Sequence, residues 1–170
     1  MNIDQNQAQA KQLKNEQNID SSLKSTVYLF SFAGLIPFIY FALSAWIPQL
    51  YLFELDPVHH FRLYSVVILS FLAGMLWAFG LVANKVQGAV AIRARSLLWS
   101  AILLSLLGWG NLFIDAKAAL FVGAMLFLVV WQIEQKTELA RHYPVWYANM
   151  RARLSMAVAM CHFIIWLTIS

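Results

Sequence analysis

The chain has 170 residues, of which 61% are hydrophobic and only 12% are charged. An ordinary soluble domain is about 45–50% apolar and about 25% charged, and a chain of this size cannot hide the excess in one core. The composition therefore excludes a water-soluble globular domain and favours lipid as the solvent. The formal net charge of +4 is modest, and most cationic side chains flank apolar segments, so we expect membrane lipids as their partners and no nucleic acid.

Five long apolar stretches follow a polar beginning. Residues 1–25 are rich in Gln, Asn, Lys and Ser, which predicts a flexible tail because so little apolar surface is available to bury. Residues 26–170 form the transmembrane domain, since each stretch approaches the roughly 20 residues that a spanning helix needs. The sequence thus predicts an all-α fold, a polytopic bundle of five transmembrane helices. Their predicted bounds are 26–47, 61–83, 96–113, 116–133 and 154–169.

The first predicted helix contains Pro37, which removes a backbone hydrogen bond, so we expect a bend there. The connection after it holds four polar side chains, Glu54, Asp56, His59 and His60. Histidines and carboxylates are metal ligands, but adjacent histidine side chains diverge and this spacing matches no known ligand motif. We therefore expect a solvated loop with helix-capping carboxylates, and no metal.

Small residues recur every four positions on the later helices. They are Ser70, Gly74 and Ala78 on the second helix, Ala101 and Ser105 on the third, Ala119 and Gly123 on the fourth, and Ser155 and Ala159 on the fifth. Helices in lipid associate through close backbone approach, which small side chains permit. These positions are predicted helix contacts.

The connections around the fourth helix carry distinct polar signals. Asp115 stands where the N-cap of that helix belongs and is predicted to accept from its free backbone N–H groups. After the helix, aromatic and cationic residues alternate in a segment predicted to lie at the membrane interface, with rings at headgroup depth and guanidinium groups on lipid phosphates. The residues of this predicted headgroup site are Trp146, Tyr147, Arg151 and Arg153.

His162 is the one strongly polar side chain well inside a predicted span, and an intramembrane ionisable residue is a functional-site hypothesis by default. A proton relay, headgroup binding and cofactor ligation are the open functional interpretations. The alternative, which we favour, is a neutral histidine bonded to another helix. A ligand-binding function predicts a cavity that reaches His162 and is lined by Asn111 or Trp109.

The Lys and Arg residues are distributed unevenly between the two sides of the predicted bundle. An N-terminus in the cytoplasm places ten of the 12 on the cytoplasmic side and leaves Arg62 and Lys117 outside. This asymmetry predicts an N-terminus inside and a C-terminus outside. The same orientation puts every tryptophan near an interface, as in the aromatic belts of membrane proteins: Trp46, Trp109 and Trp166 outside, and Trp77, Trp99, Trp131 and Trp146 inside.

Several segments resemble a family of uncharacterised bacterial membrane proteins. Residues 34–38, GLIPF, resemble its Gly-Leu-x-Pro-Phe element, and residues 64–77, YSVVILSFLAGMLW, resemble its second-helix signature. Trp99-Ser100 matches the start of its third-helix motif, with Leu103 in place of a proline. Residues 144–155 resemble its Pro-x-Trp-Tyr-x-x-Leu-Arg-x-x-Leu-Thr element.

The resemblance covers about residues 27–168, and the family it points to includes mitochondrial transmembrane protein 69. It implies five transmembrane helices and a location in the bacterial inner membrane, and it implies no activity. The second-helix signature of the family usually ends in Gly-Gly-x-His-Trp, whereas Ala73 and Leu76 replace the first glycine and the histidine here. Any function of that histidine is therefore in doubt for this chain.

The chain carries no Gly-rich phosphate loop, zinc-protease histidine pair or serine-nucleophile elbow, and its single cysteine, Cys161, excludes an internal disulfide. We therefore expect a non-enzyme without a cofactor, with no catalytic residues. The leading hypothesis is an accessory or scaffold component of a membrane assembly, with another membrane protein or a second copy as partner. The alternative is a small-molecule or lipid-binding protein or transporter that uses the bundle interior near His162.

Overall fold

The computed structural model describes residues 21–50, 56–83, 89–136 and 144–169. Most of the predicted tail, residues 1–20, lies outside these ranges. The chain divides into two compact units, Met1–Gly34 and Leu35–Ser170. In the first unit the described residues are helical from 21 to 33 and carry a stacked ring pair, Tyr28 and Phe32, with centroids 6.0 Å apart.

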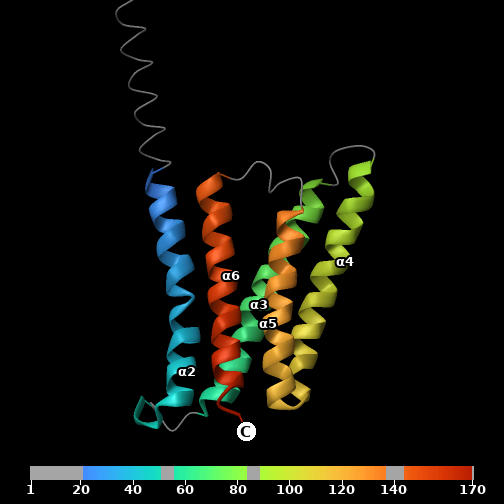
Figure 1. The fold of residues 1–170 in the computed structure, drawn as a ribbon. Coiled ribbons are helices and arrows are strands. Elements are labelled where there is room, and N and C mark those ends of the chain that lie inside the picture. Colours follow the sequence, from blue (N-terminus) through green and yellow to red (C-terminus); the bar gives the residue numbers. More distant parts are fainter. Residues whose placement is uncertain (1–20, 51–55, 84–88, 137–143, 170) are drawn as a thin grey trace, which may run out of the picture. The chain divides into compact units, whose positions relative to one another are not determined.

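The second unit is a bundle of antiparallel helices (Figure 1). Its helices are α2 (Ile36–Trp46), α3 (Pro57–Ala83), α4 (Ala89–Gly110), α5 (Ala116–Gln135) and α6 (Val145–Trp166), with short 3-10 turns η1 (Pro48–Leu50) and η2 (Asn111–Phe113). The described residues contain helices and turns only, which confirms the predicted all-α class.

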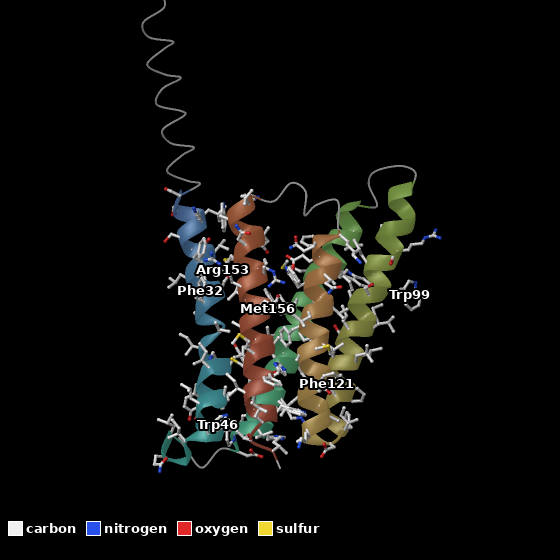
Figure 2. All side chains as sticks on the ribbon, viewed as in Figure 1. Phe32, Trp46, Trp99, Phe121, Arg153 and Met156 are labelled. Carbon is white, nitrogen blue, oxygen red and sulfur yellow. The ribbon has the colours of Figure 1, made fainter. Side chains whose placement is uncertain are left out.

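Four described helical segments are long and apolar enough to cross a membrane: Ser21–Trp46, Pro57–Leu81, Ala94–Phe113 and Ala116–Gln135. The fifth helix, α6, has 22 residues but carries two arginines and a histidine, so it is less apolar than the others. Large apolar side chains such as Trp99, Phe121 and Met156 are exposed on the bundle (Figure 2). Because water would oppose this exposure, the chain is a multi-pass membrane protein.

Several predicted helix bounds need correction, since α3 begins at Pro57 rather than 61 and α4 at Ala89 rather than 96. The fifth helix begins at Val145, nine residues before the predicted 154, because the structure directs the Arg151 side chain inward and the helix continues past it. In the first predicted helix, regular helical structure is interrupted by a turn at residues 34–35, just before Pro37. Proline cannot donate a backbone hydrogen bond and crowds the preceding turn, which accounts for the loss of regular helix at these two residues.

Helix α3 is central to the bundle, since it packs against α2, α4 and α5, while α6 packs against α2 and α5. Close approach of α3 and α4 depends on glycines. A Cβ added at Gly80 would come within 2.9 Å of the Leu98 side chain, and one added at Gly108 within 2.8 Å of Leu69. Backbone contact through small residues is how helices associate in lipid.

Of the nine predicted small-residue contact positions, four are buried, three are half-buried and two, Gly74 and Ala78, are exposed. Ala101, Ala119, Gly123 and Ser155 are buried in the bundle, as predicted. Gly74 is different, because it is exposed and a Cβ added there would meet nothing within 4 Å. Among the described residues, Gly74 of α3 therefore makes no close contact with another helix.

Candidate functional site

His162 lies on α6 in an aromatic cage, and its exposed fraction is only 2%. Its ring centroid is 4.6 Å from that of Phe61, 5.5 Å from Phe127 and 6.2 Å from Phe38. These three rings come from α3, α5 and α2, so the histidine lies where four helices converge. Its Nδ1 atom lies 2.9 Å from the carbonyl oxygen of Val158. Val158 is one turn earlier on α6, so the hydrogen-bond partner is on the same helix. The prediction that His162 bonds to another helix is therefore wrong.

The other edge of the imidazole rests against Gly123 of α5. A Cβ added at Gly123 would lie 2.7 Å from His162 Nε2 and 3.6 Å from Asn111 Nδ2. The structure therefore brings together two of the three residues predicted to bind a ligand, His162 and Asn111. Gly123 allows the contact because a side chain there would occupy the space of the histidine ring.

Asn111 begins η2 and is 8% exposed. Its Nδ2 atom donates to the carbonyl oxygen of Ala119 at 2.9 Å, which ties η2 to α5. Its Oδ1 atom is buried without a hydrogen-bond partner. Buried polar atoms are almost always partnered, so this oxygen is an acceptor with unused capacity.

Trp109, the third predicted ligand residue, lies elsewhere. It is 59% exposed and packs edge-to-face against Phe113, with ring centroids 4.8 Å apart. The indole thus belongs to the surface of the bundle, away from the buried His162 ring. Helical periodicity alone does not predict that Asn111 is buried and Trp109 exposed, because the two residues are only two positions apart at a helix end.

Arg62 of α3 connects to the corner between α4 and α5, a role that the sequence pattern did not predict. Its Nη2 atom donates to three backbone carbonyl oxygens, those of Asn111 at 2.8 Å, Leu112 at 3.0 Å and Ile114 at 3.0 Å. Carbonyl groups at a helix C-terminus lack partners within the helix and favour a cation. The Nε atom of Arg62 is buried without a partner. The sequence feature that could have pointed to this role is that Arg62 is one of only two Lys or Arg residues on the predicted outer side.

At the opposite end of the bundle, Arg151 of α6 forms a buried ion pair with Glu134 of α5. The Nη2 atom donates to Glu134 Oε2 at 2.6 Å, and Nε donates to the same oxygen at 2.9 Å. Arg151 is 7% exposed and Glu134 is 1% exposed. The prediction that Arg151 binds a lipid phosphate is therefore wrong. Arg151 binds the Glu134 carboxylate instead, because that group lies inside the bundle where α5 and α6 pack together.

The other residues of the predicted headgroup site have a different environment. Arg153 is exposed on α6 (Figure 2), whereas Trp146 and Tyr147 are half-buried near the start of the same helix. The Trp146 and Tyr147 rings pack edge-to-face with centroids 5.9 Å apart. These three residues keep the aromatic and cationic character expected at headgroup depth.

Two of the three predicted capping carboxylates are confirmed. Asp115 accepts from the backbone N–H groups of Lys117 and Ala118 at the start of α5. Asp56 accepts from Val58 N–H at 3.0 Å and His59 N–H at 3.3 Å at the start of α3. Glu54 lies outside the described residues. Within the described ranges, no group of three or more His, Cys, Asp or Glu side chains could hold a metal ion.

A family model described as protein of unknown function (DUF3429) matches residues 23–167, which is most of the chain. No curated protein and no solved structure matches the chain.

Proposed function

We propose a function for this chain as a member of the DUF3429 family of proteins of unknown function, to which it belongs. The proposed function is that of a non-enzymatic accessory or scaffold component of an assembly in the bacterial inner membrane. The observation that carries it is the exposed α3 surface at Gly74, where the added Cβ would meet nothing within 4 Å. A glycine exposed on a spanning helix lets a second helix approach its backbone closely.

The use of the charged side chains supports the same proposal. Glu134 and Arg151 bind each other, and Arg62 binds backbone carbonyls. In the described spans these groups stabilise contacts between helices of the chain, whereas a carrier or pore commonly presents such groups to its cargo. The proposed partner is therefore a transmembrane helix of another subunit, supplied either by a second membrane protein or by another copy.

The effect of filling the Gly74 position tests this proposal. Gly74→Ile is expected to weaken subunit association about tenfold while changing thermal stability little, because the added side chain occupies the approach surface and its Cβ would meet nothing within 4 Å. Association is measured by native gel electrophoresis and sedimentation in mild detergent. Leu103→Ile on the exposed side of α4 is the matched control. A wild-type protein that is strictly monomeric, with no co-purifying protein, would contradict the proposal.

The proposed orientation places the N-terminus inside and the C-terminus outside. The start of α4, the end of α5 and the start of α6 lie at one end of the bundle (Figure 1), with Arg95, Lys136 and Arg153 at those positions. The opposite end carries Arg62 and Lys117, and Lys117 Nζ lies 5.2 Å from the centroid of the Trp166 ring. The more cationic end is the proposed cytoplasmic end, following the positive-inside rule.

Reporter fusions after Ser170 test this orientation. Alkaline phosphatase fused there is expected to be active and green fluorescent protein dark, because the proposed C-terminus lies outside the cytoplasm. The same reporters joined within the 137–143 connection, on the proposed cytoplasmic side, serve as the opposite control. Cytoplasmic fluorescence from the C-terminal fusion, together with the reverse result at the control site, would overturn the orientation.

The interfacial segment of α6 supports a proposed contact with the inner-leaflet headgroups. Arg153 is exposed and is followed along the helix by an apolar surface, while the half-buried rings of Trp146 and Tyr147 lie near the helix start. Tryptophan and tyrosine settle at headgroup depth, and arginine binds phosphate through a planar fork of donors. Arg153, together with these two rings, is therefore the proposed headgroup site.

The second candidate function is binding of a small molecule or lipid by the bundle interior. The observation in its favour is the side chain of Asn111, whose Oδ1 is buried without a hydrogen-bond partner and whose Nδ2 lies 3.6 Å from a Cβ added at Gly123, beside the His162 ring. His162→Leu is expected to reduce retention of a co-purifying small molecule or lipid, as measured by native mass spectrometry. Equal retention by the wild type and the folded variant would remove this candidate.

A further inference from the structure

Two unsatisfied polar atoms of opposite kind occur at the α4–α5 corner. Arg62 Nε carries an N–H group that can only donate, and Asn111 Oδ1 can only accept. Both atoms are buried without a hydrogen-bond partner. They belong to two residues that are in direct contact, because Arg62 Nη2 donates to the backbone oxygen of Asn111 at 2.8 Å.

Rotation of the Asn111 side-chain amide by half a turn would not give Oδ1 a hydrogen-bond donor. Its Nδ2 atom donates to the Ala119 carbonyl at 2.9 Å. Exchange of the two amide atoms would place Oδ1 against that carbonyl, leaving two acceptors facing each other. The amide orientation is therefore determined by Ala119, and Oδ1 remains available as an acceptor.

The guanidinium of Arg62 is similarly constrained. Its Nη2 atom is held by the carbonyls of Asn111, Leu112 and Ile114, which complete the end of α4 and η2. Rotation that brought Nε to a new partner would break these three contacts. The group that satisfies Nε must therefore come to the corner, and it must present an acceptor to Arg62.

We propose that this corner binds one hydroxyl group, which accepts from Arg62 Nε–H and donates to Asn111 Oδ1. An anion would satisfy the arginine but would oppose the amide oxygen, a cation would do the reverse, and an apolar group would satisfy neither. A hydroxyl is the simplest group that offers both an acceptor and a donor. It is supplied either by a buried water or by an alcohol, such as the free hydroxyl of a lipid headgroup.

This site goes beyond the proposed accessory role and does not depend on it. The accessory role is tested by measuring subunit association, whereas the hydroxyl site is tested by the NMR signal of the Arg62 Nε–H group. A monomeric protein whose Arg62 Nε–H contacts a hydroxyl would support only the hydroxyl site. An assembled protein without a hydroxyl at Arg62 would support only the accessory role.

Nuclear magnetic resonance of the full chain in lipid nanodiscs, with arginine labelled in nitrogen-15, tests the proposal. The Arg62 Nε–H group is expected to show magnetisation transfer from water protons if water is bound, or from lipid protons if a lipid alcohol is bound. Arg151 provides a matched control in the same spectrum, because its Nε–H donates directly to Glu134 at 2.9 Å. It is expected to show neither transfer.

Asn111→Leu removes the acceptor and is expected to abolish the Arg62 signal from the bound hydroxyl. A wild-type Arg62 Nε–H group without transfer from either source would overturn the proposal. So would a transfer that persists unchanged in folded Asn111→Leu, since the hydroxyl would then not be shared with the amide. If that variant fails to fold, the wild-type comparison of Arg62 with Arg151 decides the question.

Discussion

Glu134→Ala is expected to destabilise the protein by about 3–5 kcal/mol, the cost of leaving one member of a buried ion pair without its partner. The guanidinium of Arg151 makes its described hydrogen bonds to the Glu134 carboxylate and is 7% exposed, so water can replace that carboxylate only poorly. The measurement is the midpoint of unfolding in mild detergent during titration with a denaturing detergent.

A double variant distinguishes loss of the ion pair from general damage to α5. Glu134→Leu combined with Arg151→Met removes both charges, and such replacements are often neutral or stabilising. We expect the double variant to recover most of the stability lost in Glu134→Ala. Arg153→Met is the surface control and should change stability little, because Arg153 is exposed. Equal stability of Glu134→Ala and the wild type would contradict a structural role for the pair.

Gly123→Ala is the second variant with a large expected effect. The added methyl would lie 2.7 Å from His162 Nε2 and 2.8 Å from Cδ2 of the same ring. The ring has little room to move, since Phe38, Phe61 and Phe127 surround it. Overpacking costs about 1–3 kcal/mol and alanine gains up to about 1 kcal/mol over glycine in a helix, so we expect a net loss of about 1–2 kcal/mol.

Gly74→Ala is the matched control, because its methyl would meet nothing within 4 Å. It makes the same chemical change on a neighbouring helix and is expected to keep or raise stability. The contact itself is tested by His162→Ala, which creates room for the methyl, so Gly123→Ala should cost less in that background than in the wild type. Additive effects of the two substitutions would show that His162 and Gly123 do not press on each other. All four variants are compared by the same unfolding assay.

Predictions from the sequence were most accurate where they depended on local pattern. The five apolar stretches are all helical, four of them are long and apolar enough to cross a membrane, and the start of α5 at Ala116 agreed with its predicted bound. Asp115 was identified as an N-cap because a carboxylate directly before a helix accepts from its free N–H groups. The interruption of the helix at residues 34–35 also has a local cause, because Pro37 disturbs the backbone hydrogen bonds of the turn before it.

Predictions about side-chain partners were less accurate. Arg151 was assigned to a phosphate because an arginine beside an interfacial tryptophan commonly has that role, but Glu134 on another helix is its partner. His162 was expected to bond to another helix and instead lies against Val158 of its own helix. In both cases the partner depends on which helix faces which, and a single sequence contains no direct measure of that.

The amino-acid sequence by itself determined the solvent and the elements of this protein, because hydrophobic length and capping act over a few consecutive residues. Only the tertiary structure decided that Arg62 closes the α4–α5 corner, that Gly123 receives the His162 ring, and that Gly74 remains open. The physical reason is that these contacts join residues far apart in the chain. Which of them form depends on how whole helices pack, and small residues of the same type can lie in the core or face lipid.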